Sequence, residues 1–141
     1  MIALKEQTFV MVKPDGVAKG LTEEATKRLE KAGLKVASVR RLRLNRRLAE
    51  ELYSVHKGKD FFEALVVHVL SGEVVAMKVE GEKAISKVRG IIGPTNPAQA
   101  PYGTIRGDFG RDIKTIIRKN IVHASDSPES AKRELAIFFK P

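Results

Sequence analysis

The first half of the chain alternates between the two spacings of apolar residues that predict strands and helices. Thr8 to Lys13 is an apolar and β-branched run that stops at Pro14-Asp15-Gly16, which predicts a strand followed by a turn. From Leu21 to Ala32 the apolar residues recur every three or four positions, so an amphipathic helix is expected, with Gly33 as its stop. Leu34 to Leu44 carries apolar residues among cations and predicts a second strand.

The middle of the chain predicts helices on both sides of a third strand. Asn45 can cap a helix that continues to about Tyr53, and a loop follows at His56-Lys57-Gly58-Lys59. Phe61 to Leu70 predicts a compact apolar helix, Val74 to Val79 the strand, and Glu82 to Ile91 another helix.

Periodicity ends between Gly93 and Gly110, where three prolines and four glycines accumulate. A loop of this length inside a small domain is usually functional or flexible. Asn120 to His123 predicts a short fourth strand. Ser127-Pro128 opens a last helix, because serine caps helices and proline suits their first position. The residues that this helix is expected to bury are Ala131, Leu135 and Phe138.

The order of these elements predicts the fold class. A chain of 141 residues has the length of one ordinary domain, so we expect residues 1–141 to form a single domain. Four short strands interleaved with helices favour an α+β sandwich of the ferredoxin-like kind, in which helices pack on a four-stranded antiparallel sheet. The order alone leaves a small mixed α/β sheet open as an alternative.

Composition narrows the class of protein. Hydrophobic residues make up 43% of the chain and charged residues 30%, which is typical of a globular protein. No run of eighteen apolar residues exists, so no membrane span is expected, and Met1 to Thr8 lacks the pattern of a signal peptide. The chain has no cysteine, which excludes disulfides and thiolate sites and fits a cytoplasmic location.

The formal net charge of +9 is concentrated in one segment. Lys27 to Arg47 contains nine basic residues and one acidic residue, Glu30, so it carries 9 − 1 = +8 and the rest of the chain only +1. Two interpretations compete. The segment forms a patch for nucleic acid or another anionic surface, or it is a solvated face without a partner, which is the commoner case.

Candidate chemistry starts from the histidines, since the chain lacks both the Walker A loop and the G-x-G-x-x-G fingerprint. His56 sits in a basic loop and is expected to be solvated. His68 lies in an apolar helix, where a packed, hydrogen-bonded histidine is expected. His123 ends a strand beside a polar turn and a helix N-terminus, so a reactive and a structural role weigh equally. Their spacing does not indicate a zinc site.

Three cations are candidates for binding phosphate: Lys13, Arg89 and Arg106. Arg106 lies in the loop rich in glycine and proline, and its planar guanidinium matches phosphate oxygens. One lysine and two arginines beside one histidine would suit phosphoryl transfer, which needs mainly positioning and charge neutralisation.

Five segments together resemble the nucleoside diphosphate kinase family. They occur in the family's order, cover nearly the whole chain, and are Thr8-Phe-Val-Met-Val-Lys-Pro-Asp-Gly-Val17, His56-Lys-Gly-Lys-Asp-Phe-Phe62, Gly93-Pro-Thr-Asn-Pro97, Gly103-Thr-Ile-Arg-Gly-Asp-Phe109 and Asn120-Ile-Val-His-Ala-Ser-Asp-Ser127. The set is far more specific than any one of its members.

The resemblance implies a role for each matching position. His123 corresponds to the nucleophile that accepts the γ-phosphoryl group. The positions that match groups holding phosphates and sugar are Lys13, Arg89, Thr95, Arg106 and Asn120. The other matches are Phe61 as the ring that stacks the base, Tyr53 as the site tyrosine, Ser125 and Glu134 as residues that orient the histidine, and Asp126 as an acid near the metal-bound phosphates.

The resemblance also implies a reaction and its partners. A phosphohistidine formed from a nucleoside triphosphate and discharged to a nucleoside diphosphate gives ping-pong kinetics. Stacking on Phe61 reads a face that every base has, so broad base specificity is expected. Mg²⁺ would be carried mainly on the nucleotide, without a metal site built by the protein. A homo-oligomer is implied, with a hexamer favoured over a tetramer.

The chain departs from the family pattern at two places, and two other functions stay open. Gly110 to Lys119 is longer than the usual link to the histidine strand and is basic, and Ala124 replaces the commoner glycine after His123. A ferredoxin-like module that binds nucleic acid through Lys27 to Arg47, and an interaction domain without catalysis, remain alternatives. Nucleic-acid binding is also compatible with the kinase as a second activity.

Overall fold

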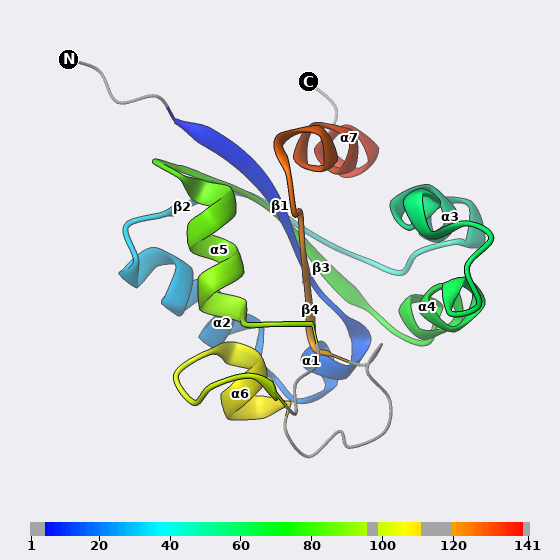
Figure 1. Ribbon diagram of the computed structural model, residues 1–141, viewed down its shortest axis with the longest axis horizontal. Coiled ribbons are helices and arrows are strands. Elements are labelled where there is room, and N and C mark those ends of the chain that lie inside the picture. Colours follow the sequence, from blue (N-terminus) through cyan, green and yellow to red (C-terminus); the bar gives the residue numbers. More distant parts are fainter. Residues whose placement is uncertain (1–4, 96–98, 111–119, 140–141) are drawn as a thin grey trace.

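The computed structural model describes residues 5–95, 99–110 and 120–139 and contains a four-stranded antiparallel sheet covered by helices (Figure 1). The strands lie in the order β2-β3-β1-β4, which confirms the expected ferredoxin-like α+β fold. The elements are β1 (Glu6–Val12), α1 (Pro14–Ala18), α2 (Thr22–Lys31), β2 (Lys35–Leu42), α3 (Arg46–Leu52), η1 (Ser54–His56), α4 (Phe62–Leu70), β3 (Val74–Gly81), α5 (Ala84–Ile92), α6 (Ile105–Phe109), β4 (Val122–Ala124) and α7 (Pro128–Phe138).

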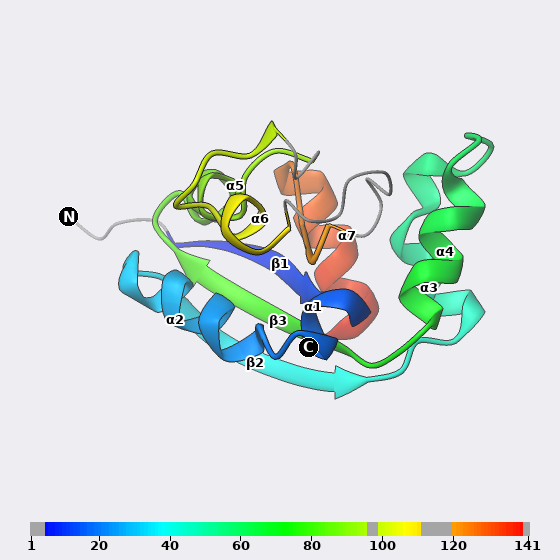
Figure 2. The same ribbon diagram turned by 90° about the horizontal axis from the view of Figure 1, so that it is seen from below.

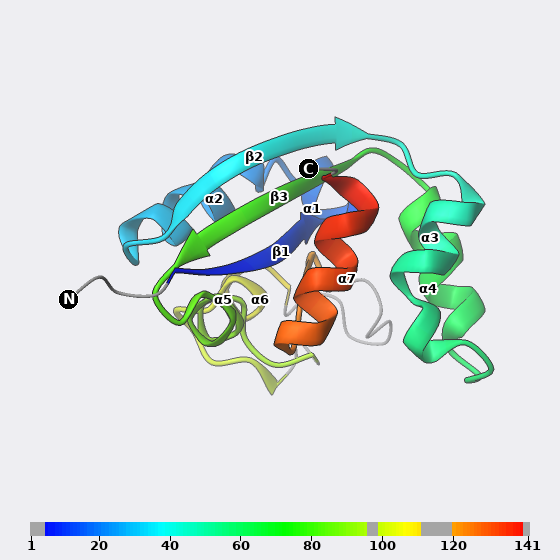
Figure 3. The ribbon, with the colours of Figure 1, turned by 90° about the horizontal axis from the view of Figure 1, so that it is seen from above.

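The central strand β1 separates two hydrophobic cores. Its side chains alternate between the two faces of the sheet, so Val10 and Val12 join one core while Phe9 and Met11 join the other. Helices α2 and α5 cover the first face, and α3, α4 and α7 cover the second. Figures 2 and 3 show α3 and α4 side by side beyond one end of the sheet. Both faces of β1 are therefore buried.

Two helices occupy segments in which the sequence predicted a turn and a loop. Pro14-Asp15-Gly16 begins α1, because proline suits the first position of a helix and an acidic residue suits its first turn. The expected loop from Gly93 to Gly110 contains α6, whose Thr104 side chain caps the helix by accepting the amide hydrogen of Gly107. At Gly107 a Cβ would collide with the backbone of Pro101, so only glycine allows this helix to pack so closely.

The last helix presents a different face from the one expected. Ala131 and Phe138 are buried as predicted, but the third buried residue is the acidic Glu134 and not Leu135, which is half-buried. A carboxylate is rarely buried unless it is paired, so its position already indicates a polar partner inside the molecule. Ala32, predicted on the apolar stripe of α2, is exposed.

The basic segment Lys27 to Arg47 is partly neutralised by neighbouring carboxylates. Its ion pairs join Arg28 to Glu24 and Asp108, Arg41 to Glu73, Arg46 to Glu50 and Glu63, and Arg47 to Glu51. Binding of a partner by this segment stays a prediction. The basic stretch that follows Gly110 lies outside the described residues. Among the residues that the structure describes, no helix is long and apolar enough to cross a membrane.

Candidate active site

A cavity lies between the carboxyl-terminal end of β1, the α3–α4 pair and the start of α7. Its volume of about 370 Å³ suits a small-molecule ligand. Most of the predicted site residues line it: Lys13, Tyr53, Phe61, Arg89, Thr95, Arg106, Asn120, His123, Asp126 and Glu134. Ser125 is the exception, since it is buried behind the cavity and contacts Glu134.

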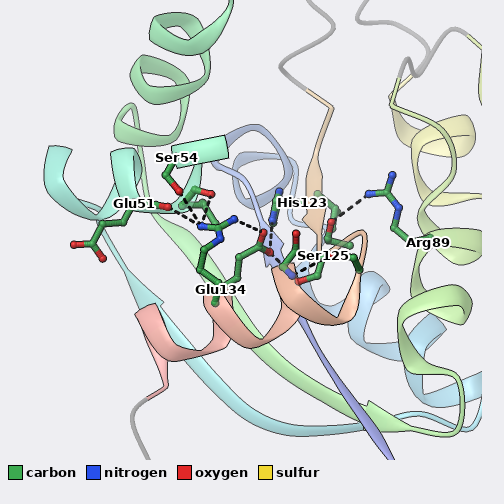
Figure 4. Close-up of polar contacts among 12 residues, drawn as sticks. Glu51, Ser54, Arg89, His123, Ser125 and Glu134 are labelled. Atoms are coloured by element: carbon green, nitrogen blue, oxygen red, sulfur yellow. Dashed lines mark hydrogen bonds and ion pairs between the residues drawn. The ribbon is translucent and has the colours of Figure 1, made fainter. Parts of the chain in front are cut away.

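His123 is held by Glu134 at the wall of the cavity. The Nε2 atom of His123 lies 2.8 Å from Oε1 of Glu134, and the Ser125 hydroxyl donates to the same oxygen over 2.8 Å (Figure 4). An ionised carboxylate can only accept, so Nε2 carries the hydrogen and Nδ1 of the neutral ring keeps its lone pair. The ring therefore has a defined tautomer with a lone pair on Nδ1.

Arg133 connects this pair to the opposite wall of the cavity. Its guanidinium donates to Oε2 of Glu134 over 3.2 Å and to the backbone carbonyls of Glu51 and Leu52 at the end of α3. Carbonyls at the end of a helix lie where a cation is favourable. Arg133 thus fixes the end of α3, which carries Tyr53, relative to Glu134. The sequence analysis did not identify this arginine.

Two buried cations, Lys13 and Arg106, line the cavity. Burial, and next the charge of Arg106, lower the pKa of Lys13 to about 7. Burial, and next the charge of Arg89, lower the pKa of Arg106 to about 10. Cations that repel each other in a poorly solvated site favour an anionic ligand, because an anion stabilises every one of them.

Arg106 also supports the backbone around the cavity. It donates to the carbonyl oxygens of Asn120 over 3.1 Å, Gly93 over 2.9 Å and Val122 over 2.5 Å. A guanidinium has five N–H groups, so two are left over from these three bonds to described residues and can donate to a ligand. Arg89 is anchored in a similar way, because it donates to the carbonyl of Ala124 over 3.2 Å (Figure 4).

Asn120 links two sides of the cavity. Its side-chain oxygen accepts from Nζ of Lys13 over 2.8 Å, and its side-chain nitrogen donates to the carbonyl of Thr95 over 3.0 Å. The Asn120 amide therefore fixes the Lys13 amine at the cavity floor and holds the backbone at Thr95. Thr95 itself is exposed at the cavity edge.

An aromatic wall closes the outer part of the cavity. The rings of Phe61 and His56 lie 5.1 Å apart, and Nζ of Lys59 lies 5.6 Å from the centre of the Phe61 ring. His56, which was predicted to be solvated, is half-buried and also lines the cavity. The short helix η1 turns it inward, which a loop assignment could not show. Burial, and next the charge of Lys59, lower the pKa of His56.

The acidic residues of the cavity do not form a metal cage. Among the described residues no group of three or more histidine or acidic side chains could hold a metal ion. Glu134 is engaged by His123, Ser125 and Arg133, which leaves the exposed Asp126. A single carboxylate fits a Mg²⁺ ion that takes most of its ligands from phosphates and water.

The third histidine behaves as the sequence predicted. His68 is buried in α4, and its Nε2 atom lies 2.9 Å from Oδ1 of Asp15. Ala124, which replaces the glycine common in the family, lies within the extended strand β4 and needs no left-handed backbone.

Comparisons with known proteins agree on one family. A family model described as nucleoside diphosphate kinase matches residues 6–141. A protein of that name from Archaeoglobus fulgidus is 55% identical over 134 residues, which is 95% of this chain and 86% of the relative. One from Staphylothermus marinus is 52% identical over 135 residues, 96% of this chain and 93% of the relative.

Solved structures give the same result. A nucleoside diphosphate kinase from Halobacterium salinarum, solved in complex with CDP, has a TM-score of 0.91 at 42% identity and covers 98% of this chain and 90% of its own. The enzyme from Encephalitozoon cuniculi has a TM-score of 0.90 at 38% identity, with 96% and 90% covered.

Proposed function

Since this chain belongs to the nucleoside diphosphate kinase family, we propose that it works through a phosphohistidine formed at His123. The chain is a phosphotransferase that moves the γ-phosphoryl group of a nucleoside triphosphate to a nucleoside diphosphate. The observation that carries the proposal is the hydrogen bond from Nε2 of His123 to Glu134, in a cavity that also holds Lys13 and Arg106.

The first half-reaction forms a bond between Nδ1 of His123 and the γ-phosphorus. The bond from that phosphorus to the β–γ bridging oxygen breaks, and the nucleoside diphosphate leaves with the electron pair. The ring gains positive character as its lone pair is shared, and Glu134 stabilises that charge while the proton stays at Nε2. Lys13 and Arg106 would neutralise the charge on the transferring oxygens.

The second half-reaction reverses the first with another nucleotide. A β-phosphate oxygen of the second diphosphate attacks the phosphorus, the N–P bond breaks, and the imidazole is restored with its original tautomer. Both halves use the same cavity, so one nucleotide must leave before the next binds. This order gives ping-pong kinetics.

The outer wall of the cavity would accept many bases. Phe61 offers an aromatic face, and stacking on a face does not distinguish bases by their hydrogen-bonding edges. The fixed tautomer of His56 adds one donor, because Nδ1 accepts from the Lys59 amine at 3.2 Å and leaves the hydrogen on Nε2. We expect several nucleoside diphosphates to serve as acceptors, in line with the CDP complex of the Halobacterium salinarum relative.

Two further polar side chains of the cavity, Tyr53 and Asp126, would also serve the bound nucleotide. The buried hydroxyl of Tyr53 has no hydrogen-bond partner among the described residues, and burial raises its pKa, so it remains a donor for a bound phosphate. Mg²⁺ bound with the nucleotide would neutralise phosphate charge, with Asp126 as the carboxylate within reach.

Residues 1–141 would act as one domain within a homo-oligomer, with a hexamer favoured over a tetramer.

Pulse labelling tests the proposal. Incubation with γ-labelled ATP and Mg²⁺ should give a phosphoprotein whose label is lost in acid and kept in alkali, as expected for phosphohistidine. The label should move to unlabelled ADP without any third component. His56→Ala and His68→Ala test the competing histidines, and both should still carry the label. A label stable in acid, or one lost only in these two variants, would overturn the assignment.

Nucleotide binding should take up a proton above neutral pH. With its pKa lowered to about 7, Lys13 is increasingly neutral in the free protein as the pH rises. Phosphate oxygens favour the charged amine and raise its pKa, so the bound state holds more protons. Affinity for ADP should therefore fall by up to about tenfold per pH unit between about pH 7 and 9. Calorimetry in buffers of different ionisation heats measures the uptake. Lys13→Met should remove it, and an unchanged uptake in that variant would contradict the assignment.

A further inference from the structure

We propose that Asp15 is a positioning residue for the reaction, because it holds the strained residue between Asn120 and His123 in its working conformation. The inference rests on the roles proposed above for His123 and Asn120. Asp15 lies in α1, which starts two residues after the end of β1, and is distant in sequence from both. Its side chain does not line the cavity that contains His123.

Each oxygen of the Asp15 carboxylate has its own partner. Oδ1 lies 2.9 Å from Nε2 of His68, and Oδ2 accepts the backbone N–H of Ile121 over 2.9 Å. Burial by itself would raise the pKa of Asp15, but the hydrogen bonds from His68 and Ile121 and the charge of Lys13 lower it below its ordinary value. The group therefore stays an ionised acceptor near neutral pH.

Ile121 needs this support because its backbone is left-handed. Its φ is +76°, a conformation that β-branched residues rarely adopt. Both of its backbone polar groups are held by the segment after β1. The N–H donates to Asp15, and the carbonyl accepts from the N–H of Lys13 over 2.7 Å.

The packing of α1 leaves Ile121 little room to move. A Cβ added to Gly16 would lie 2.8 Å from the Ile121 carbonyl oxygen, so α1 sits directly against this residue. The Ile121 side chain is fully buried. Strained backbone conformations that tight packing holds in place are concentrated at functional sites.

The conformation of Ile121 sets the direction of its neighbours. Asn120 on one side binds Lys13, and Val122 on the other begins β4, in which His123 pairs with Met11 of β1. If Ile121 relaxed to an ordinary backbone angle, the amide and the imidazole would move relative to each other. Misplacement of reacting groups by about 1 Å costs about 10²-fold in rate.

The test replaces Asp15 and follows the chemical step. Asp15→Ala should lower the single-turnover rate of His123 phosphorylation at saturating ATP by about 10²-fold, because the acceptor of the Ile121 N–H is lost. Asp15→Asn should stay within about threefold, since the amide oxygen accepts from Ile121 and its NH₂ group can donate to His68 in the other tautomer. Glu23→Ala, at an exposed acid on α2, is the matched control and should not change the rate.

A second variant and a stability measurement keep the test decisive. Asp15→Glu preserves the charge but displaces the acceptor, and it replaces Asp15→Ala if that variant does not fold. Rates are compared at temperatures where circular dichroism shows each variant fully folded. A role in stability alone would lower the melting temperature and leave the rate of the folded protein intact, and that result would overturn the inference.

The outcome separates this inference from the proposed function. If the wild-type chain is labelled on His123 and Asp15→Ala and Asp15→Glu are labelled equally fast, only the inference fails. If the wild-type chain carries no label on His123, the proposed function fails first. His68→Phe should retain most of the rate, because Asp15 keeps its bond to Ile121.

Discussion

Replacement of His123 by alanine should lower kcat for phosphoryl transfer from ATP to a nucleoside diphosphate by at least about 10⁴-fold, because the covalent route then has no nucleophile. The other histidines cannot substitute. His68 is bound to Asp15 away from the cavity, and Nδ1 of His56 is occupied by the Lys59 amine. Direct transfer between two nucleotides would need both in a cavity that has the volume for one.

The measurement combines turnover, labelling and binding. The variant should bind ADP as well as the wild type does within about threefold, because the cations of the cavity remain in place. It should show no acid-labile label after incubation with ATP. Turnover above about one per cent of the wild-type value by a folded variant would mean that the phosphoryl group does not pass through this residue.

Arg106→Ala should reduce both stability and turnover. Removal of the guanidinium takes one donor from each of the carbonyls of Gly93, Asn120 and Val122, of which Asn120 still accepts the N–H of Val122, at a cost of about 3 kcal/mol. The loss of a charge-stabilising donor at the transferring phosphoryl group should lower kcat by about 10²–10³-fold. Urea denaturation and steady-state kinetics on the folded variant measure the two effects separately.

Two further variants give this prediction its controls. Arg106→Lys keeps the charge but loses the fork that reaches several carbonyls, so it should recover part of the turnover and little of the stability. Arg47→Ala removes an arginine whose side chain is 84% exposed, and it should change stability by less than about 0.5 kcal/mol. If Arg106→Ala had the same free energy of unfolding as Arg47→Ala, the three bonds from Arg106 to backbone carbonyls would not stabilise the fold as expected.

The elements with strong apolar periodicity could be predicted from the sequence. The strands from Thr8 and from Val74 are inner strands of the sheet and appear where expected, because burial on both faces demands a continuous apolar run. Helix α6 was missed, because its five residues lie among prolines and glycines that break periodicity. The hydropathy pattern did not predict that Glu134 is buried, because such a pattern assigns a carboxylate to the surface.

The sequence predicted which residues line the site but not how they contact one another. The family motifs predicted the residues that gather at the cavity, but His123 lies in the middle of β4 and not at the end of a strand, as was expected. Arg133 and Asp15 contact residues far apart in the chain, such as Glu51, whose carbonyl accepts from Arg133, and Ile121, whose N–H donates to Asp15. Such contacts depend on the packing of helices, which no local pattern records.

The position of β1 between two cores has a consequence for how this enzyme can change. Phe9 packs against Phe138 at 4.8 Å and lies 5.9 Å from the His123 ring, while the strand leads directly into Lys13. A mutation that loosens either core is therefore transmitted to the reacting groups without an intervening loop to absorb it. Evolutionary variation in this protein should accumulate on the outer faces of its helices and on the edge strand β2, and leave β1, β3 and β4 almost invariant.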